Sequence, residues 1–296
     1  MTNSSFPRTN MQTKGYSLWS IVYVLYFIFY ILIINSSLFA QDSSPKRIIS
    51  LGPAITRQLS LLDVEDKIIG VTTYCNVPNL VNTERIGTVL EANVEKILIL
   101  NPDIVLATNL SNLKTIQRLK NLKINVVVLD EVKNFNGLCE QFLKLAQLVG
   151  KEKIGRAIIS KAEEKLSNLS QKNKNLSKQK VVVQIGANPL WIVTKDSMIN
   201  NFVLLAGGIN VGPIGENGLV SREYIVKQNP DVIIIIDMGI LAEEEKGTWL
   251  KFDTINAVIQ NRIHILDAYD ICSPTPLSFV GTLEELFELF YPGIEY

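Results

Sequence analysis

Apolar runs of strand length alternate along this chain with segments whose apolar residues recur at helical spacing. In its first half, short apolar runs of strand length stand at 47–52, 67–72, 103–108 and 124–130. Apolar residues at helical spacing lie between the later runs, at 93–100 and 110–121. Strands that alternate with helices are typical of a parallel sheet covered by helices. The pattern therefore predicts an α/β lobe.

Two consecutive helices are predicted in the middle of the chain. Apolar residues recur at steps of three and four from Phe135 to Val149, which marks an amphipathic helix ending at Gly150. A second helix, at 151–172, carries few apolar residues among many charges. A helix of about 22 residues would span roughly 33 Å. A polar segment without apolar periodicity follows at 170–180.

The order of strands and helices then begins again. Strands are predicted at 180–186, 231–237 and 262–267, and helices at 198–205 and 276–291. We therefore expect two Rossmann-like lobes with parallel sheets, joined by one long linker helix. Ligands of such folds bind at the carboxyl ends of the strands, so the cleft between the lobes is the expected ligand site.

This organisation sets four predicted segments. They are 1–40 as a signal peptide or N-terminal anchor, 41–150 as the N-terminal lobe, 151–176 as the linker helix, and 177–296 as the C-terminal lobe with its C-terminal helix.

One stretch of sequence occurs in both lobes. "IGTVLEANVEKILILNPDIV" at 86–105 aligns without a gap with "IGENGLVSREYIVKQNPDVI" at 214–233. Glu95 and Glu223 occupy equivalent positions in the first turn of a predicted helix, where the helix dipole stabilises a carboxylate by about 0.3–1 kcal/mol. Alternatively, two carboxylates on equivalent lobes would suit a two-fold partner that offers one basic residue per subunit.

The N-terminus carries an export signature. Residues 18–34 are almost entirely apolar, Arg8 and Lys14 precede them, and no acidic residue appears before Asp42. We predict a signal peptide cleaved after Ala40, with an uncleaved anchor as the alternative. No cysteine follows the run closely enough to carry a lipid anchor, so a periplasmic location is expected.

Composition argues against several other functions. Basic and acidic residues balance at 29 each, which gives no indication of nucleic-acid binding. His264 is the only histidine and lies in a predicted strand, as a packed or edge-exposed side chain, so no metal-ligand cluster is apparent. The glycine-rich stretch 206–218 follows a helix and lacks a nucleotide-binding fingerprint, and no catalytic motif is present. We expect no enzyme, no catalytic residue and no cofactor.

Three cysteines are too few for a disulfide framework. They are Cys75, Cys139 and Cys272. Cys75 and Cys272 both follow predicted strands and could pair near one cleft, but we expect unpaired thiols.

From Arg47 to about Pro292 the chain resembles the helical-backbone class of ABC-importer solute-binding proteins, which bind vitamin B12 and ferric siderophores or haem. The matching stretches are "RIISLGPAITRQLSLL", "IIGVTTYCNVP", "ANVEKILILNPDIVLA", the linker helix, "LLAGGINV" and "VSREYIVKQNPDVIIII". The resemblance implies a monomer that captures a metal chelate and delivers it to a permease dimer, on which Glu95 and Glu223 dock. It also implies a linker helix that limits closure. A membrane-anchored sensor of the same fold, or a haem-binding importer component, is the alternative function.

Four residues are candidate ligand contacts because they follow predicted strands. They are Tyr74, Trp191, Tyr269 and Asp270, and each could instead pack structurally. Trp249, in the acidic stretch 241–252, is expected to anchor a loop.

The identity of the chelate stays open. In the vitamin B12 binders that this chain resembles, tryptophans stand six residues before each docking glutamate, whereas this chain has Val89 and Asn217. Haem would need Tyr74 or Tyr269 as an axial ligand. An anionic siderophore would need a cleft arginine, for which Arg57 and Arg222 are nearest, although Arg222 could simply point to solvent.

Overall fold

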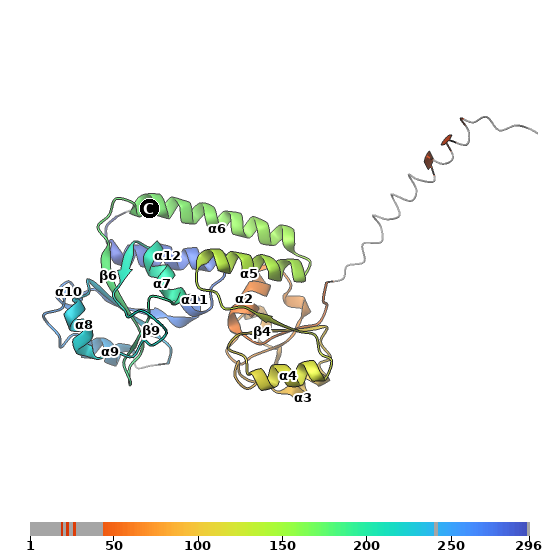
Figure 1. Cartoon of the computed structure of the whole chain (residues 1–296), viewed down its shortest axis with the longest axis horizontal. Helices are drawn as coiled ribbons and strands as arrows, with labels where there is room; N and C mark the ends of the chain where they lie inside the picture. The colour runs from red at the N-terminus through yellow and green to blue at the C-terminus, as the bar shows by residue number, and fades with distance from the viewer. Residues whose placement is uncertain (1–18, 20–21, 24–25, 28–43, 240–241, 295–296) are drawn as a thin grey trace, which may run out of the picture. The chain divides into compact units, whose positions relative to one another are not determined.

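The computed structural model describes residues 44–239 and 242–294, together with residues 19, 22–23 and 26–27. The chain from Ser44 to Tyr296 forms one compact unit that contains two sheets (Figure 1). Apart from the few positions named, the predicted signal or anchor segment 1–40 lies outside the described residues. Among the residues that are described, no helix combines the length and the apolar character needed to cross a membrane.

The first sheet is parallel throughout, as predicted, and its strand order is β3-β2-β1-β4-β5. Its strands are β1 (Ile48–Ser50), β2 (Ile68–Val71), β3 (Glu84–Arg85), β4 (Ile104–Thr108) and β5 (Val126–Leu129). The helices of this lobe are α2 (Pro53–Leu61), α3 (Val94–Ile99), α4 (Leu113–Asn121) and α5 (Phe135–Leu148), with short 3-10 turns at Glu65–Lys67 and Pro78–Leu80.

Alternate residues of these strands meet different helices, because successive side chains of a strand point to opposite faces. Ile48 of β1 packs with α2 and α5. Its neighbour Ile49 packs with α3 and α4. The sheet is therefore the middle layer of three, and α3, the helix of Glu95, lies on the opposite face from α5.

The second sheet has the order β10-β9-β6-β7, with β8 also paired to β6. Its strands are β6 (Gln179–Gly186), β7 (Trp191–Ile192), β8 (Gly208–Asn210), β9 (Val232–Asp237) and β10 (Ile263–Asp267). One strand departs from the expected parallel sheet, since β7 runs antiparallel to β6. The reason is the short connection between them, which allows a hairpin and leaves no room for a crossover helix. The glycine-rich stretch 206–218 contains β8, which the sequence did not predict.

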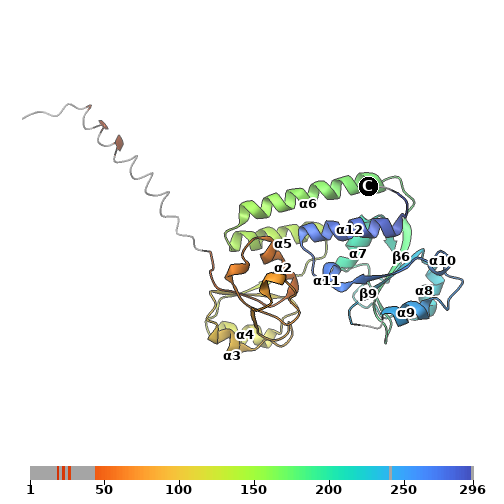
Figure 2. The ribbon, with the colours of Figure 1, turned by 180° about the vertical axis from the view of Figure 1, so that it is seen from behind.

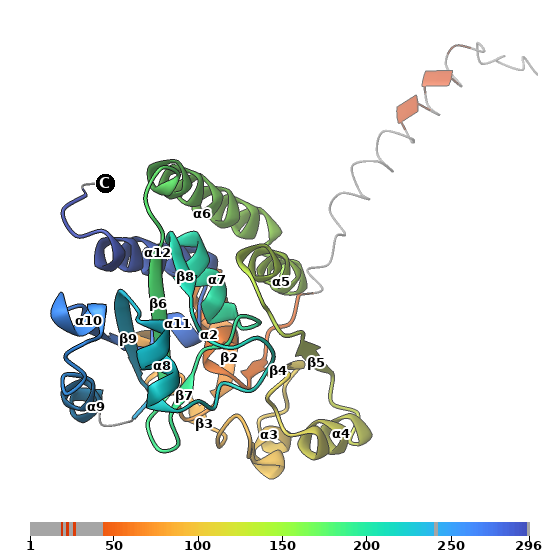
Figure 3. The same cartoon turned by 60° about the vertical axis from the view of Figure 1, so that its left-hand side comes forward.

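Helices also cover both faces of the second sheet (Figure 3). They are α7 (Met198–Leu205), α8 (Arg222–Gln228), α9 (Ala242–Trp249), α10 (Asn256–Ile259), α11 (Ala268–Cys272) and α12 (Pro276–Phe290). Val183 of β6 packs with α7 and α12. Val182 packs with α8, α9 and α10 on the other face. The helix of Glu223 therefore lies on the face opposite to α12, as α3 lies opposite to α5 in the first lobe.

Helix α5 belongs to two hydrophobic cores. Its first turns place Phe135 and Leu138 in the core of the C-terminal lobe, where the Phe135 ring lies 5.1 Å from that of Phe279. Its later turns place Phe142 and Leu145 in the core of the N-terminal lobe. The apolar stripe that predicted one amphipathic helix thus joins the two lobes.

The linker helix α6 runs over Glu152–Asn173, close to the predicted 151–172. It lies along α5 and α12 in two opposite views (Figures 1 and 2). Ala162 and Leu169 of α6 are buried in the core that α12 and the start of α5 also enter. A layer of three helices therefore connects the lobes. The segment boundaries at 41, 151 and 177 remain predictions.

The repeated Asn-Pro-Asp motif has one structural role in both lobes. Asn101 and Asn229 follow α3 and α8 with φ of 44° and 46°, the left-handed conformation that asparagine tolerates at helix ends. The side chain of the aspartate then binds the backbone at the first strand of its own sheet. Asp103 Oδ2 accepts a hydrogen bond from the backbone N–H of Arg47 at 2.9 Å, and Asp231 Oδ2 accepts one from the start of β6 at 2.9 Å. The motif therefore ends a helix and also fixes that end to the sheet.

A close approach between α5 and α6 gives a first prediction. A Cβ atom at Gly155 would lie 2.6 Å from the Cβ of Ala146. Extra carbon in a well-packed contact costs about 1–3 kcal/mol. We expect Gly155→Ala to lower the free energy of unfolding by that amount, measured by urea denaturation.

Gly281 of α12 is the matched control, because a Cβ there meets nothing within 4 Å. Replacing a helix-interior glycine with alanine at an open position stabilises by about 0.5–1 kcal/mol. Gly281→Ala should therefore raise the free energy of unfolding. Equal stabilisation by both substitutions would contradict the tight contact between α5 and α6.

Candidate ligand-binding site

A cavity of about 550 Å³ lies between the two lobes. In the N-terminal lobe it is bounded by the start of α2 and by the segments that follow β4 and β5. In the C-terminal lobe it is bounded by Ile185 of β6, by the start of α7 and by the end of α11. The carboxyl ends of parallel strands are where doubly wound folds bind ligands, and the volume lies within the usual range of ligand pockets, about 300–1,000 Å³.

The cavity wall is largely apolar. Ile55 and Leu110 come from one lobe, and Ile185, Ile199 and Ile271 from the other. Such a wall favours the apolar faces of an organic ligand.

Sulfur atoms and polar groups interrupt this wall. Met198 and Cys272 contribute the sulfur atoms. Gln58 is 1% exposed, and its Oε1 has no hydrogen-bond partner. Two of the described residues that line the cavity are charged. They are Asp130 and Glu131, which directly follow β5. The site therefore offers two carboxylates, while the unpartnered Gln58 oxygen is itself buried in the wall.

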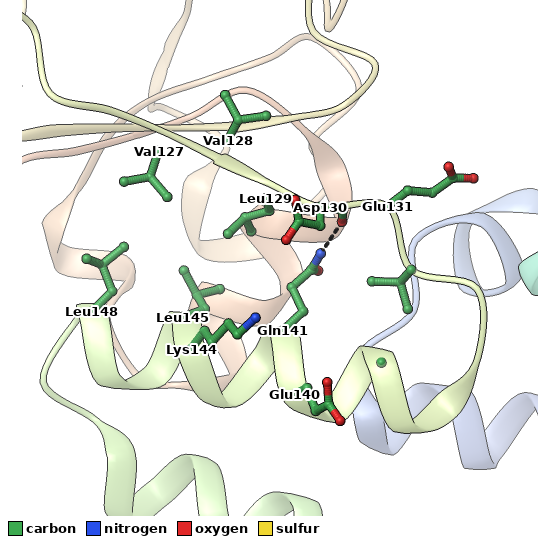
Figure 4. A pocket seen from close by; sticks show the side chains of 12 residues that line it. Val127, Val128, Leu129, Asp130, Glu131, Glu140, Gln141, Lys144, Leu145 and Leu148 are labelled. Carbon is green, nitrogen blue, oxygen red and sulfur yellow. Dashed lines mark hydrogen bonds between the residues drawn. The ribbon is translucent and has the colours of Figure 1, made fainter.

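A second pocket, of about 330 Å³, adjoins the cavity beside α5 (Figure 4). Asp130, Glu131 and Gln141 line both. Gln141 Nε2 donates a hydrogen bond to the backbone oxygen of Asp130 at 2.6 Å, which fixes the end of β5 against the helix. Glu140 and Lys144 add one acidic and one basic group on the helix side.

Two of the predicted contacts, Tyr74 and Trp191, lie apart from the cavity lining. Tyr74 is 68% exposed. Trp191 is half-buried on β7 and lines a separate pocket of about 500 Å³ with Asn188 and Pro189. The structure does not bring these two aromatic side chains together in one wall, and their contact with ligand stays a prediction.

The other two predicted contacts take part in a polar cluster between the lobes. Arg57 of α2 donates to Asp270 Oδ1 at 2.5 Å, to the backbone oxygen of Ser273 at 2.8 Å and to that of Tyr269 at 3.1 Å. Its guanidinium carbon lies 4.6 Å from the centre of the Tyr269 ring. The Tyr269 hydroxyl donates to the backbone oxygen of Asn76 at 2.8 Å. These groups are engaged with each other, and the ligand-contact role of Tyr269 and Asp270 stays a prediction.

Arg222 is also engaged, and the suggestion that it points to solvent is wrong. Its guanidinium pairs with Glu245 at 2.7 Å and lies over the Trp249 ring, 4.7 Å from the ring centre. Trp249 Nε1 donates to Gln184 Oε1 at 2.7 Å, and Gln184 Nε2 donates to Glu245 at 2.7 Å. Trp249 is fully buried at the end of a helix, so it anchors α9 where the sequence suggested a loop.

Both docking candidates, Glu95 and Glu223, are exposed in the first turn of their helices. The predicted N-caps form in both, since Asn93 Oδ1 accepts from Lys96 N–H at 2.9 Å and Ser221 Oγ accepts from Tyr224 N–H.

The two carboxylates differ in their neighbours. Glu95 pairs with Arg118 of α4 at 2.9 Å, and both side chains are more than half exposed. Such exposed pairs contribute little to stability, so a partner's basic group can compete for the carboxylate. Glu223 forms no salt bridge in the described part of the chain. Its own backbone N–H, and then the Ser221 hydroxyl, hold the pKa of its carboxyl below the ordinary value.

The remaining candidates form no metal site. His264 is half-buried on the edge strand β10, and burial lowers its pKa. All three cysteines are unpaired, as expected. Burial, with smaller contributions from two glutamates, raises the pKa of Cys139 to about 12. No group of three or more histidine, cysteine or carboxylate side chains among the described residues could hold a metal ion.

Known proteins have a similar sequence and architecture. The sequence pattern of the periplasmic binding protein family matches residues 48–268. YvrC, an ABC-transporter substrate-binding lipoprotein of Bacillus subtilis, is 30% identical over 260 residues, which cover 84% of this chain and 81% of that protein.

Two solved structures have a similar fold. The periplasmic vitamin B12-binding protein of Vibrio cholerae gives a TM-score of 0.72 at 22% identity, covering 83% of this chain and 96% of that one. A periplasmic haem-binding protein of Pseudomonas aeruginosa gives a TM-score of 0.77 at 20% identity, covering 85% and 94%.

This chain belongs to the periplasmic binding protein family. The predicted fold class of two α/β lobes is confirmed by the solved structures. The chain is a solute-binding protein of an ABC importer and not an enzyme, as the sequence predicted. That role implies a small-molecule ligand, a permease partner and a location outside the cytoplasm.

The buried pair in the C-terminal lobe gives a second prediction. Removing one partner of a buried ion pair leaves the other charge uncompensated. We expect Glu245→Ala to lower the free energy of unfolding by about 2–4 kcal/mol, measured by urea denaturation, because Arg222 and Gln184 both lose their partner.

The neighbouring Glu244 provides the control, since it is exposed on the same helix. Glu244→Ala should change stability by less than about 0.5 kcal/mol. A similar loss in both variants would mean that the pair adds nothing beyond the helix charge.

Proposed function

We propose that this protein captures a metal chelate in the interlobe cavity and delivers it to the permease of an ABC importer. The observation that carries the proposal is the cavity itself, which both lobes line with apolar and a few polar groups. Such a wall suits an organic ligand wrapped around a metal better than a bare ion, which would need a cluster of ligating side chains. The protein then needs no cofactor of its own.

The delivery step uses Glu95 and Glu223. Both are exposed, both follow the same capping arrangement, and their helices lie on corresponding faces of the two sheets. A monomer with this pseudo-symmetry fits a permease dimer that offers one basic residue per subunit. Paired charges of this kind fix orientation more than they add affinity.

Closure is expected to be small. The lobes share the helices α5, α6 and α12, and the first turns of α5 are buried in the opposite core. A wide hinge motion would expose those apolar side chains. The proposed cycle is therefore capture, modest closure, docking, and release when the permease pulls the lobes apart.

The location is proposed to be periplasmic, after cleavage of the N-terminal segment at Ala40. The first cysteine of the given sequence is Cys75, whereas the Bacillus subtilis relative is named a lipoprotein. A mature N-terminus at Gln41 would support this location. An intact apolar segment in the native protein would favour the membrane-anchored sensor.

Haem is the second candidate among the chelates. The Pseudomonas aeruginosa structure is that of a haem-binding protein, and Met198 lines the interlobe cavity here. A methionine thioether is a known axial ligand of haem iron. Tyr74 and Tyr269 are weaker axial candidates, because neither lines this cavity and the Tyr269 hydroxyl is bonded to Asn76.

A third prediction tests capture. Purified protein is titrated with cobalamin, cobinamide, haem and a panel of ferric siderophores, with binding followed by tryptophan fluorescence and calorimetry. We expect saturable one-to-one binding of one class. The bound chelate should slow alkylation of Cys272, which lines the cavity, because it covers the thiol.

The other two cysteines serve as internal controls. Cys75 and Cys139 are buried, so neither should react in the folded protein, with or without ligand. Labelling is done at alkaline pH, because burial raises the pKa of Cys272. Binding without protection of Cys272 would place the ligand outside the interlobe cavity.

A fourth prediction tests delivery. Replacing both Glu95 and Glu223 with alanine should abolish uptake of the bound chelate while its affinity stays unchanged, since neither side chain lines the cavity. Uptake of radiolabelled chelate by cells and calorimetry of the purified variant measure the two quantities.

Glu164→Ala on the exposed side of α6 is the matched control, and it should transport normally. If the double variant loses affinity and retains uptake, the docking assignment is wrong.

A further inference from the structure

The interlobe cavity has an uneven distribution of charge. Of the described residues that line it, Asp130 and Glu131 carry full charges, and no lysine or arginine is among them. Both carboxylates are exposed at the end of β5. The adjoining pocket adds Glu140 and a single base, Lys144, so the surroundings do not compensate both acidic groups.

The two arginines that the sequence placed near the expected cleft are already paired within the protein. Arg57 is bound to Asp270 and to two backbone oxygens, with its side chain 16% exposed. Arg222 is paired with Glu245 beneath the Trp249 ring. Freeing either guanidinium for a ligand would leave a carboxylate without its partner.

Helix ends change this balance only in part. The N-termini of α2 and α7 face the cavity, and each carries about half a positive charge. The first turn of α7 is already capped by Ser197, whose side chain accepts from the Asn200 N–H. Two full negative charges therefore outweigh these partial positive ones.

We propose that the chelate taken by this cavity is neutral or cationic. The inference rests on the proposed capture of a chelate and adds its charge class. An anionic chelate would meet Asp130 and Glu131 with like charge and would find no lysine or arginine among the described residues that line the cavity. Selection therefore works by repulsion of anions as well as by attraction of cations.

The test uses pairs of chelates that share a scaffold and differ in charge. The first pair is the ferric complex of a linear trihydroxamate with a terminal ammonium group and its N-succinyl derivative. The second is cobalamin and its monocarboxylate, in which one side-chain amide is hydrolysed. The third is the dimethyl ester of haem and haem itself. Calorimetry on the purified full-length protein gives each dissociation constant at low salt.

On the scaffold that binds, we expect the neutral or cationic member to bind at least about tenfold more tightly than its anionic partner. Replacing Asp130 with asparagine and Glu131 with glutamine should reduce that ratio to about threefold or less. High salt should reduce it in the unaltered protein as well, because exposed charges are screened.

A control variant tests whether the effect belongs to these two carboxylates. Glu164→Gln removes an exposed carboxylate of α6 that does not line the cavity, and it should leave the ratio unchanged.

The outcomes distinguish this inference from the proposed function. If the anionic member binds as tightly as its partner or more tightly, the charge class is wrong while capture of a chelate stands. If no scaffold binds to the folded protein, the proposed function fails, and the charge class fails with it.

Discussion

The division of one apolar stripe between two cores is the constraint on which this structure depends. Helix α5 buries Phe135 and Leu138 in one lobe and Phe142 and Leu145 in the other. Each set removes large apolar side chains from water, at about 25 cal/mol per Å² of apolar surface. Neither lobe can turn far without exposing part of its own core, and the cavity lies where the strand ends and helix starts of the two lobes meet.

The two arginines that the sequence placed near the cleft form ion pairs within the protein. Arg57 joins α2 to the α11 segment of the other lobe, and Arg222 joins α8 to α9 through Glu245. Both arginines were candidates for binding an anion from their position in the sequence. Their intramolecular partners remove them from that role and leave carboxylates as the charged groups of the cavity.

The sequence predicted what depends on local periodicity. The main strands, α5, α6 and the caps of α3 and α8 follow from apolar spacing and from Asn93 and Ser221, and family motifs identified the class. Contacts between distant segments could not be predicted, because no local pattern records them. Arg57, for example, meets residues more than 200 positions away. The hairpin of β7 was missed because its strand is only two residues long.

The paired Asn-Pro-Asp motifs have a mechanical consequence. Asp103 and Asp231 each fasten the end of a helix that carries an exposed glutamate to the first strand of its own sheet. A load applied at Glu95 or Glu223 therefore passes into the central strand of a lobe within one helix length. Each exposed glutamate is thus connected to the centre of its own sheet through one helix and one hydrogen-bonded aspartate.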